Sequence, residues 1–69
     1  MKVVSGREFA RLAERRGWKL LRINGSHHIY GRDGSRVRLT IPVQGATALK
    51  PGLCRHLAKL AEIEDELDM

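Results

Sequence analysis

The chain has 69 residues, 42% of them apolar, so it can form one small hydrophobic core and has no room for a second domain or a dinucleotide-binding cleft. Thirteen Lys and Arg stand against eight Asp and Glu, but five of the acids lie in residues 62–69, so residues 1–61 carry a net charge of +10. Nine of the cations are Arg, whose planar guanidinium binds phosphate well, and the composition therefore favours nucleic acid as the partner.

The N-terminal region carries a helix-start signal. Residues Ser5-Gly6-Arg7-Glu8 have the S-x-x-E pattern of a capping box, in which the hydroxyl and the carboxylate each accept a hydrogen bond from a free backbone amide. Phe9, Leu12 and Ala13 follow as an apolar stripe at helical spacing, and Gly17 is a stop signal. The pattern predicts a helix that begins at the box and ends near Gly17.

Residues 18–41 change to period-two alternation, which is typical of strands. Asn24-Gly25 and Asp33-Gly34 interrupt the alternation, and these dipeptides favour tight hairpin turns because both residues tolerate positive φ. The pattern predicts three antiparallel strands, near residues 19–23, 26–31 and 35–41.

A second helix is expected after the polar connection of residues 42–48. Pro51 is suited to its first turn, where the missing N–H costs nothing. Its apolar stripe is formed by Leu53, Leu57, Leu60 and Ala61. The sequence thus predicts an α+β protein of order α-β-β-β-α, a three-stranded antiparallel sheet with two helices on one face. The acidic tail from Glu62 is expected to extend the second helix, to fray, or to fold against a basic surface or a partner.

Strand alternation assigns the sheet residues to two faces. Toward the core we expect the apolar set Leu21, Ile23, Ile29, Val37, Leu39 and Ile41, with His27 on the same side as Ile29. On the exposed face we expect Arg22, Ser26, His28, Tyr30, Arg36, Arg38 and Thr40.

His28 is the histidine with chemistry available on that face. Imidazole near neutral pH can take a proton from an RNA 2′-hydroxyl or give one to a leaving oxygen. The surrounding arginines would hold the scissile phosphate, and Tyr30 would stack a base or bind a phosphate. Such a reaction needs no metal or cofactor, because the RNA supplies its own nucleophile.

Simpler interpretations stand beside this one. On pattern alone, an exposed histidine is more often solvated than catalytic, and His27 is more often a half-buried structural residue. His27, His28, Cys54 and His56 lack the spacing of a zinc site, so no metal is expected. Charge pattern does not separate RNA binding from RNA cleavage, which leaves open a non-catalytic RNA-binding module and, less favoured, a DNA-binding accessory protein.

Cysteine content and hydropathy bear on location. Cys54 is the single cysteine, so no intramolecular disulfide forms and a reducing compartment fits. No apolar stretch has the length of a signal peptide or a membrane span. We therefore expect a cytoplasmic protein without membrane attachment.

Five segments in order carry a family resemblance: Ser5-Gly6-Arg7-Glu8, Gly17-Trp18, Asn24-Gly25-Ser26-His27-His28-Ile29-Tyr30, Ile41-Pro42-Val43 and Leu49-Lys50-Pro51-Gly52. In this order and spacing the chain resembles the HicA (YcfA-like) toxin family of bacterial toxin–antitoxin systems, over about residues 2–61. The resemblance implies a double-stranded-RNA-binding-domain-like fold, cleavage of mRNA, and a HicB-type antitoxin that blocks the active site. The family's catalytic histidine is the second of the G-S-H-H motif, which falls on His28 and leaves Gly25 and His27 as motif residues.

Two departures from the family pattern are expected to matter. Gln44 stands where many relatives have a histidine, and an amide can form hydrogen bonds but cannot titrate. Ala61-Glu62-Ile63 lacks the glycine that relatives commonly have after the second helix, so the helix is expected to run on or to make different C-terminal contacts.

The sequence as a whole predicts one domain over residues 1–69, with an acidic tail at 62–69, that acts as a metal-independent endoribonuclease toxin. His28 is expected to act as general acid or base. The residues expected to bind RNA are Arg22, Ser26, Tyr30, Arg36, Arg38 and, at the start of the second helix, Lys50. So small a core can gain stability from self-association or from the antitoxin, and the sequence leaves both open.

Overall fold

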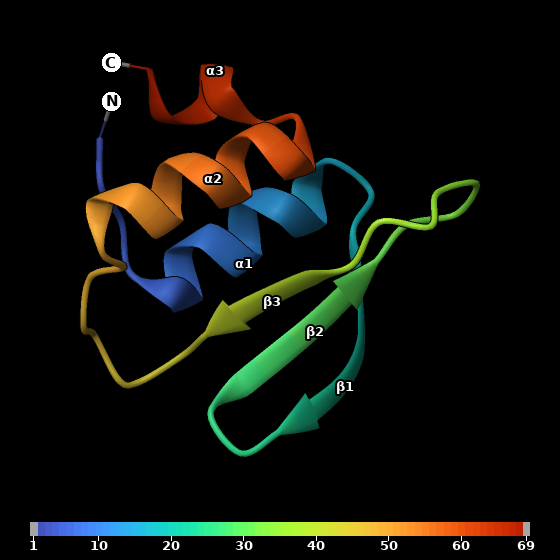
Figure 1. Ribbon diagram of the computed structural model, residues 1–69, viewed down its shortest axis with the longest axis horizontal. Coiled ribbons are helices and arrows are strands. Elements are labelled where there is room, and N and C mark those ends of the chain that lie inside the picture. The colour runs from blue at the N-terminus through green and yellow to red at the C-terminus, as the bar shows by residue number, and fades with distance from the viewer. Residues whose placement is uncertain (1, 69) are drawn as a thin grey trace.

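The computed structural model describes residues 2–68. Its elements are α1 (Gly6–Arg15), β1 (Lys19–Asn24), β2 (His27–Gly31), β3 (Leu39–Pro42), α2 (Pro51–Ala61) and α3 (Glu64–Leu67). The strands form one antiparallel sheet in the order β1-β2-β3, and α1 and α2 cover one of its faces (Figure 1). The predicted α+β class and α-β-β-β-α order are confirmed, and a short third helix is added.

The first helix begins and ends where the local signals predict. Ser5 is its N-cap, and the Ser5 Oγ accepts a hydrogen bond of 3.1 Å from the Glu8 backbone N–H. At the other end Gly17 has a φ of +94°, which a glycine adopts without strain. The Trp18 N–H bonds to the Ala13 carbonyl at 3.1 Å, which closes a Schellman turn and directs the tryptophan into the core.

The core lies between the covered face of the sheet and the two long helices. Tyr30 pairs with Leu39 across β2 and β3, and both are buried. The helices contribute further side chains that are fully or almost fully buried, among them Phe9 and Ala13 of α1 and Cys54, Leu57 and Ala58 of α2. Within residues 2–68 no helix has the length and apolar character that crossing a membrane requires.

The third strand is shorter than predicted. It begins at Leu39, and residues 32–38 form a loop that extends beyond the sheet (Figure 1). The Val37 N–H donates to the Ser35 Oγ at 3.1 Å, and the Arg38 guanidinium donates to the carbonyls of Ser35 and Val37. These local bonds satisfy backbone groups that a strand would use for its ladder, so Arg36 and Arg38 lie in a loop and not on the sheet.

The face assignment of β2 is wrong by one residue. Tyr30 is buried and lies on the covered face, and His28 shares that face because alternate strand residues point the same way. Ile29, predicted to point inward, lies on the opposite, open face, where its register partners are Arg22 and Thr40. His27, which was expected beside Ile29 in the core, shares the open face with it and is exposed.

The first strand also departs from its predicted burial. A bulge between Leu20 and Arg22 interrupts its alternation, and all six of its residues are exposed. Leu21 and Ile23, predicted as core residues, therefore contribute little to the core.

The acidic tail folds back instead of fraying or extending α2. Within Ala61-Glu62-Ile63, which lacks a glycine, Glu62 takes the left-handed conformation with a φ of 60°, and α2 ends there. Ile63 and Leu67 are then buried, so the tail contributes to the core, at about 1.5–3 kcal/mol for each large apolar side chain.

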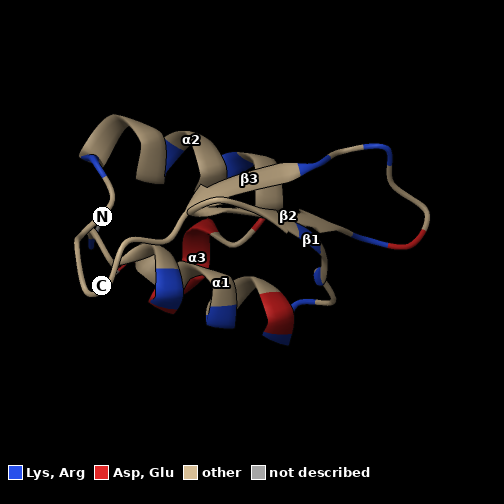
Figure 2. Ribbon diagram, turned by 90° about the horizontal axis from the view of Figure 1, so that it is seen from below, with Lys and Arg blue, Asp and Glu red and all other residues tan. Residues whose placement is uncertain are grey.

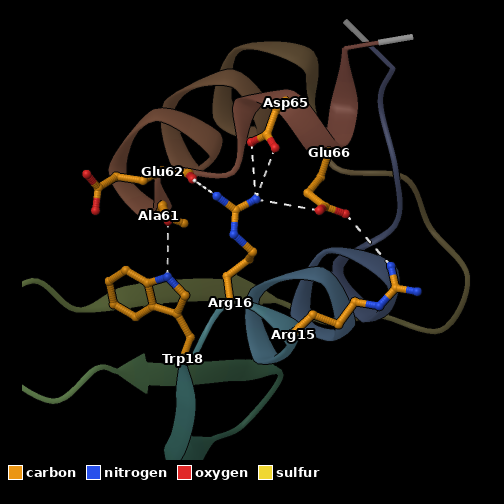
Figure 3. A network of polar contacts seen from close by, with 7 residues as sticks. All are labelled: Arg15, Arg16, Trp18, Ala61, Glu62, Asp65 and Glu66. Atoms are coloured by element: carbon orange, nitrogen blue, oxygen red, sulfur yellow. Dashed lines mark hydrogen bonds and ion pairs between the residues drawn. The ribbon is translucent and has the colours of Figure 1, made fainter.

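Arginines of α1 and its C-cap hold the tail on the surface. The Arg16 guanidinium bonds to both carboxylate oxygens of Asp65 at 3.2 Å, to Glu66, and to the Glu62 carbonyl, and Arg15 lies 3.8 Å from Glu66 (Figure 3). Figure 2 shows the acidic residues of α3 beside the basic residues of α1. These exposed ion pairs add little free energy each, so they orient a tail whose apolar residues supply most of the stability.

Candidate functional site

The His28 side chain lies in a pocket of about 330 Å³ between α1 and β2. Besides His28, the pocket is lined by Arg7, Ala10, Arg11 and Glu14 of α1, by Tyr30 of β2 and by Val43. His28 is half-buried there, because α1 passes over the strand that carries it. The histidine is thus held at the rim of the core and faces a hollow that solvent reaches.

Two arginines of α1 make the pocket suitable for an anion. Arg7 and Arg11 are four residues apart, so their side chains lie on the same side of the helix. Both are exposed, and neither forms an ion pair within residues 2–68. Their guanidinium groups are free to bind a phosphate in front of His28.

A partly buried hydrogen bond joins two of the residues that line the pocket. The Tyr30 hydroxyl donates to the Glu14 carboxylate at 2.9 Å and joins α1 to β2. Burial, the hydrogen bond to Glu14 and the negative charge of Glu14 together raise the pKa of Tyr30 from 10.0 to about 12, and burial has the largest effect. The phenol therefore stays protonated and acts as a hydrogen-bond donor. With 3% of its surface exposed, the ring has no free face on which a base could stack.

Replacement of Tyr30 by Phe is expected to change how stability depends on pH. Below pH 10 the folded and unfolded states both keep the phenol proton, so the interaction contributes fully. Between the unfolded value of 10.0 and the folded value of about 12, only the unfolded state loses the proton, so the free energy of unfolding falls as pH rises. Urea denaturation across this range should show a fall in the original protein that exceeds that of Tyr30→Phe by up to about 3 kcal/mol. Parallel curves for the two proteins would contradict the assigned environment.

The other residues expected to bind RNA are not gathered at His28. Arg22 lies on the open face of the sheet, and Arg36 and Arg38 lie in the loop that follows β2. Ser26 lies in the turn between β1 and β2, where Gly25 has a φ of +63° and the Ser26 carbonyl accepts a hydrogen bond from Val43. The basic residues thus occupy several faces (Figure 2).

Lys50 and Gln44 lie together in a different hollow. Lys50 is the N-cap of α2 and provides no side-chain capping bond. It lines a pocket of about 390 Å³ that also contains Gln44, Thr47 and Leu53. Gln44 therefore adjoins the start of α2, while the neighbouring Val43 lines the His28 pocket.

Sequence reasoning missed Arg7, Arg11 and Glu14 as site residues. All three lie outside the apolar stripe of the first helix, and all three are exposed. One sequence signal could have found them. The three residues are spaced by four and then three positions, so their side chains lie on the same flank of the helix. Which part of the sheet that flank meets depends on how α1 crosses β2, and no local pattern contains that information.

The fold and the site define the class of protein: a small α+β domain whose pocket holds a histidine and two arginines that have no ion-pair partner within residues 2–68. Residues 6–63 match the family model described as the HicA toxin of bacterial toxin–antitoxin systems, and the chain belongs to this family. The match extends from the start of α1 to Ile63, so it includes every residue of the His28 pocket. A comparison with curated proteins gives no match. The chain is thus a toxin of a toxin–antitoxin system, which implies an antitoxin as its partner.

Proposed function

We propose that this toxin is an endoribonuclease that cleaves mRNA, with His28 as the proton-transfer residue. The observation that carries the proposal is the pocket itself, which combines a half-buried histidine with two arginines that have no ion-pair partner within residues 2–68. A histidine beside cationic phosphate ligands is what cleavage by the RNA's own 2′-hydroxyl requires. The family of this toxin supports the same activity.

The proposed reaction is an internal transfer at one phosphate. The 2′-oxygen attacks the adjacent phosphorus, the bond from phosphorus to the 5′-oxygen breaks, and the products are a 2′,3′-cyclic phosphate and a 5′-hydroxyl. His28 either accepts the 2′-hydroxyl proton, with water protonating the leaving oxygen, or, when it starts as imidazolium, donates its proton to that oxygen while water takes the 2′-hydroxyl proton. Arg7 and Arg11 bind the non-bridging oxygens and stabilise the added negative charge of the transition state.

Glu14 and Tyr30 are positioning residues in this proposal. Their 2.9 Å hydrogen bond fixes α1 against β2, and these two elements supply the arginines and the histidine. A phenol that stays protonated keeps this link intact at the pH of the cell. The pair thereby holds the distance between the phosphate-binding groups and His28.

We further propose that the protein acts in the cytoplasm, where mRNA is available, and that a HicB-type antitoxin neutralises it by covering the His28 pocket. The support for this proposal is that solvent reaches the pocket between α1, β2 and Val43, so a partner that packs there would cover His28. No cofactor takes part in the proposed reaction, since the nucleophile belongs to the substrate.

The test is incubation of the folded toxin with a long single-stranded RNA in the presence of a chelator. Fragments ending in 2′,3′-cyclic phosphate and 5′-hydroxyl are expected. A matched strand with 2′-deoxyribose throughout lacks the nucleophile and should remain whole. RNA binding without fragments would replace this proposal with a non-catalytic RNA-binding module, and a preference for duplex DNA at equal salt would indicate a DNA-binding protein.

A further inference from the structure

The outer edge of the sheet exposes an apolar strand. Within residues 2–68, β1 lies at the edge of the sheet and pairs with β2 alone, so its other side presents unpaired backbone N–H and C=O groups. Leu20, Leu21 and Ile23 are 44%, 52% and 56% exposed. The one further exposed large apolar side chain within residues 2–68 is Leu60 of α2, which is less exposed, at 36%. An edge with free backbone groups and exposed apolar side chains is the form of surface to which a strand of a partner adds.

The apolar side chains lie on both faces of this edge. Leu20 pairs with Tyr30 and Ile23 with His28, so both belong to the face that carries the His28 pocket. Leu21 points to the open face, where its Cδ1 lies beside Gly31 and close to the Arg38 guanidinium. A strand added to β1 would therefore find apolar contacts above and below the sheet, as a paired strand requires.

The charge of the edge decides between two occupants. β1 carries Lys19 and Arg22, and Arg38 lines the hollow beside Leu21. Asp33 lines the same hollow, 3.4 Å from the Lys19 Nζ, so cations still outnumber acids along this edge. A second copy of the chain paired through β1 would set an equally basic edge against this one, and like charges on paired strands are destabilising. A strand with acidic residues would instead meet complementary charge along the edge.

The edge also adjoins the proposed active site. β2, which carries His28, is the direct neighbour of β1, and strands in a sheet are about 4.8 Å apart, so an added strand would lie about 10 Å from β2. Long side chains of such a strand on the helix-covered side would point toward the His28 pocket. One partner could then extend the sheet and close the pocket together.

We propose that β1 is the docking edge for an extended acidic segment of the antitoxin, which pairs with β1 as a fourth strand of the sheet. The inference rests on the proposed neutralisation by an antitoxin, and it assigns the surface that the antitoxin uses. It does not depend on RNA cleavage, because it concerns binding alone.

The test compares Leu21→Glu with Leu21→Lys, using the purified HicB-type antitoxin of the same toxin–antitoxin pair as the probe. Both changes remove the apolar contact, but only the glutamate repels an acidic partner, so we expect Leu21→Glu to weaken the complex at least about tenfold more than Leu21→Lys. Leu60→Glu is the matched control on α2 and should leave the affinity unchanged. Equal affinity of Leu21→Glu and the original toxin would overturn the proposal.

Further measurements distinguish loss of binding from loss of folding, and the antitoxin from a second copy of the chain as the occupant of the edge. The melting temperatures of the free variants should match the original, since Leu21 is half exposed, and hydrogen exchange should show the Lys19–Asn24 amides becoming protected in the complex. Unprotected β1 amides in the complex would overturn strand pairing. A free toxin that is dimeric, and that Leu21→Glu makes monomeric, would identify a second copy as the occupant. If no RNA cleavage is observed while these binding results are obtained, the proposed activity is wrong and the assignment of β1 as the docking edge is still supported.

Discussion

Replacement of His28 by Ala is expected to lower the rate of RNA cleavage by about 10²–10⁴-fold, the usual contribution of a positioned general acid or base. The side chain lines the pocket with Arg7 and Arg11, and no other histidine does so. RNA binding should change little, because the phosphate is held mainly by the two arginines. Single-turnover cleavage and equilibrium binding, measured at the same salt concentration, test the two expectations together.

His27 provides the matched control. It is the neighbouring residue on the same strand, but it is exposed and points to the opposite face of the sheet. His27→Ala should therefore cleave RNA at nearly the original rate. If His27→Ala lost activity while His28→Ala kept it, the pocket between α1 and β2 would not be the catalytic site.

Replacement of Trp18 by Ala is expected to lower the free energy of unfolding by about 3–5 kcal/mol. The indole is 1% exposed, and its Nε1–H donates to the Ala61 carbonyl at 3.1 Å (Figure 3). The Arg32 guanidinium lies over the ring, 4.5 Å from its centroid. Since a small domain has a free energy of unfolding of only about 5–15 kcal/mol, the variant should be largely unfolded at a low concentration of denaturant.

Trp18→Phe separates packing from the hydrogen bond. Phenylalanine keeps most of the buried ring but leaves the Ala61 carbonyl without its donor, so a loss of about 1–3 kcal/mol is expected. Urea denaturation of the original and both variants gives the comparison. An alanine variant as stable as the phenylalanine variant would show that the ring is not part of the core.

The helices could be predicted because their signals are local. The Ser5 cap, the glycine at position 17 and the proline at position 51 each act within one turn of helix, and all three stand where the structure begins or ends a helix. The match between these signals and the helix bounds reflects interactions between residues only three to five positions apart.

The orientation of β2 could not be predicted in the same way. Alternation leaves two choices for a strand, and the apolar Ile29 was taken as the inward residue in preference to Tyr30. The structure makes the opposite choice, because the Tyr30 hydroxyl finds an acceptor in Glu14, sixteen residues away. A tyrosine can be buried once its hydroxyl has a partner, and a partner on another element leaves no trace in the strand pattern.

Only part of the candidate site could be predicted from the sequence. The family motif and the alternation both singled out His28. Alternation placed it on the exposed face, whereas it lies on the helix-covered face and lines the pocket. Arg7 and Arg11 enter the site only because α1 crosses β2, and the tail is held by Arg16 contacts that span 46 to 50 residues. Such contacts depend on the finished packing of the helices on the sheet.

The position of bound RNA on the toxin tests directly whether the pocket between α1 and β2 is the site at which RNA binds. Backbone and side-chain NMR signals of the toxin should be followed while a 2′-O-methyl RNA, which cannot be cleaved, is added at moderate salt. We expect the largest changes at Arg7, Arg11 and His28, on the helix-covered side of the sheet. Changes confined to Arg22, Ile29 and Thr40 would place the RNA on the open face and contradict the proposed site.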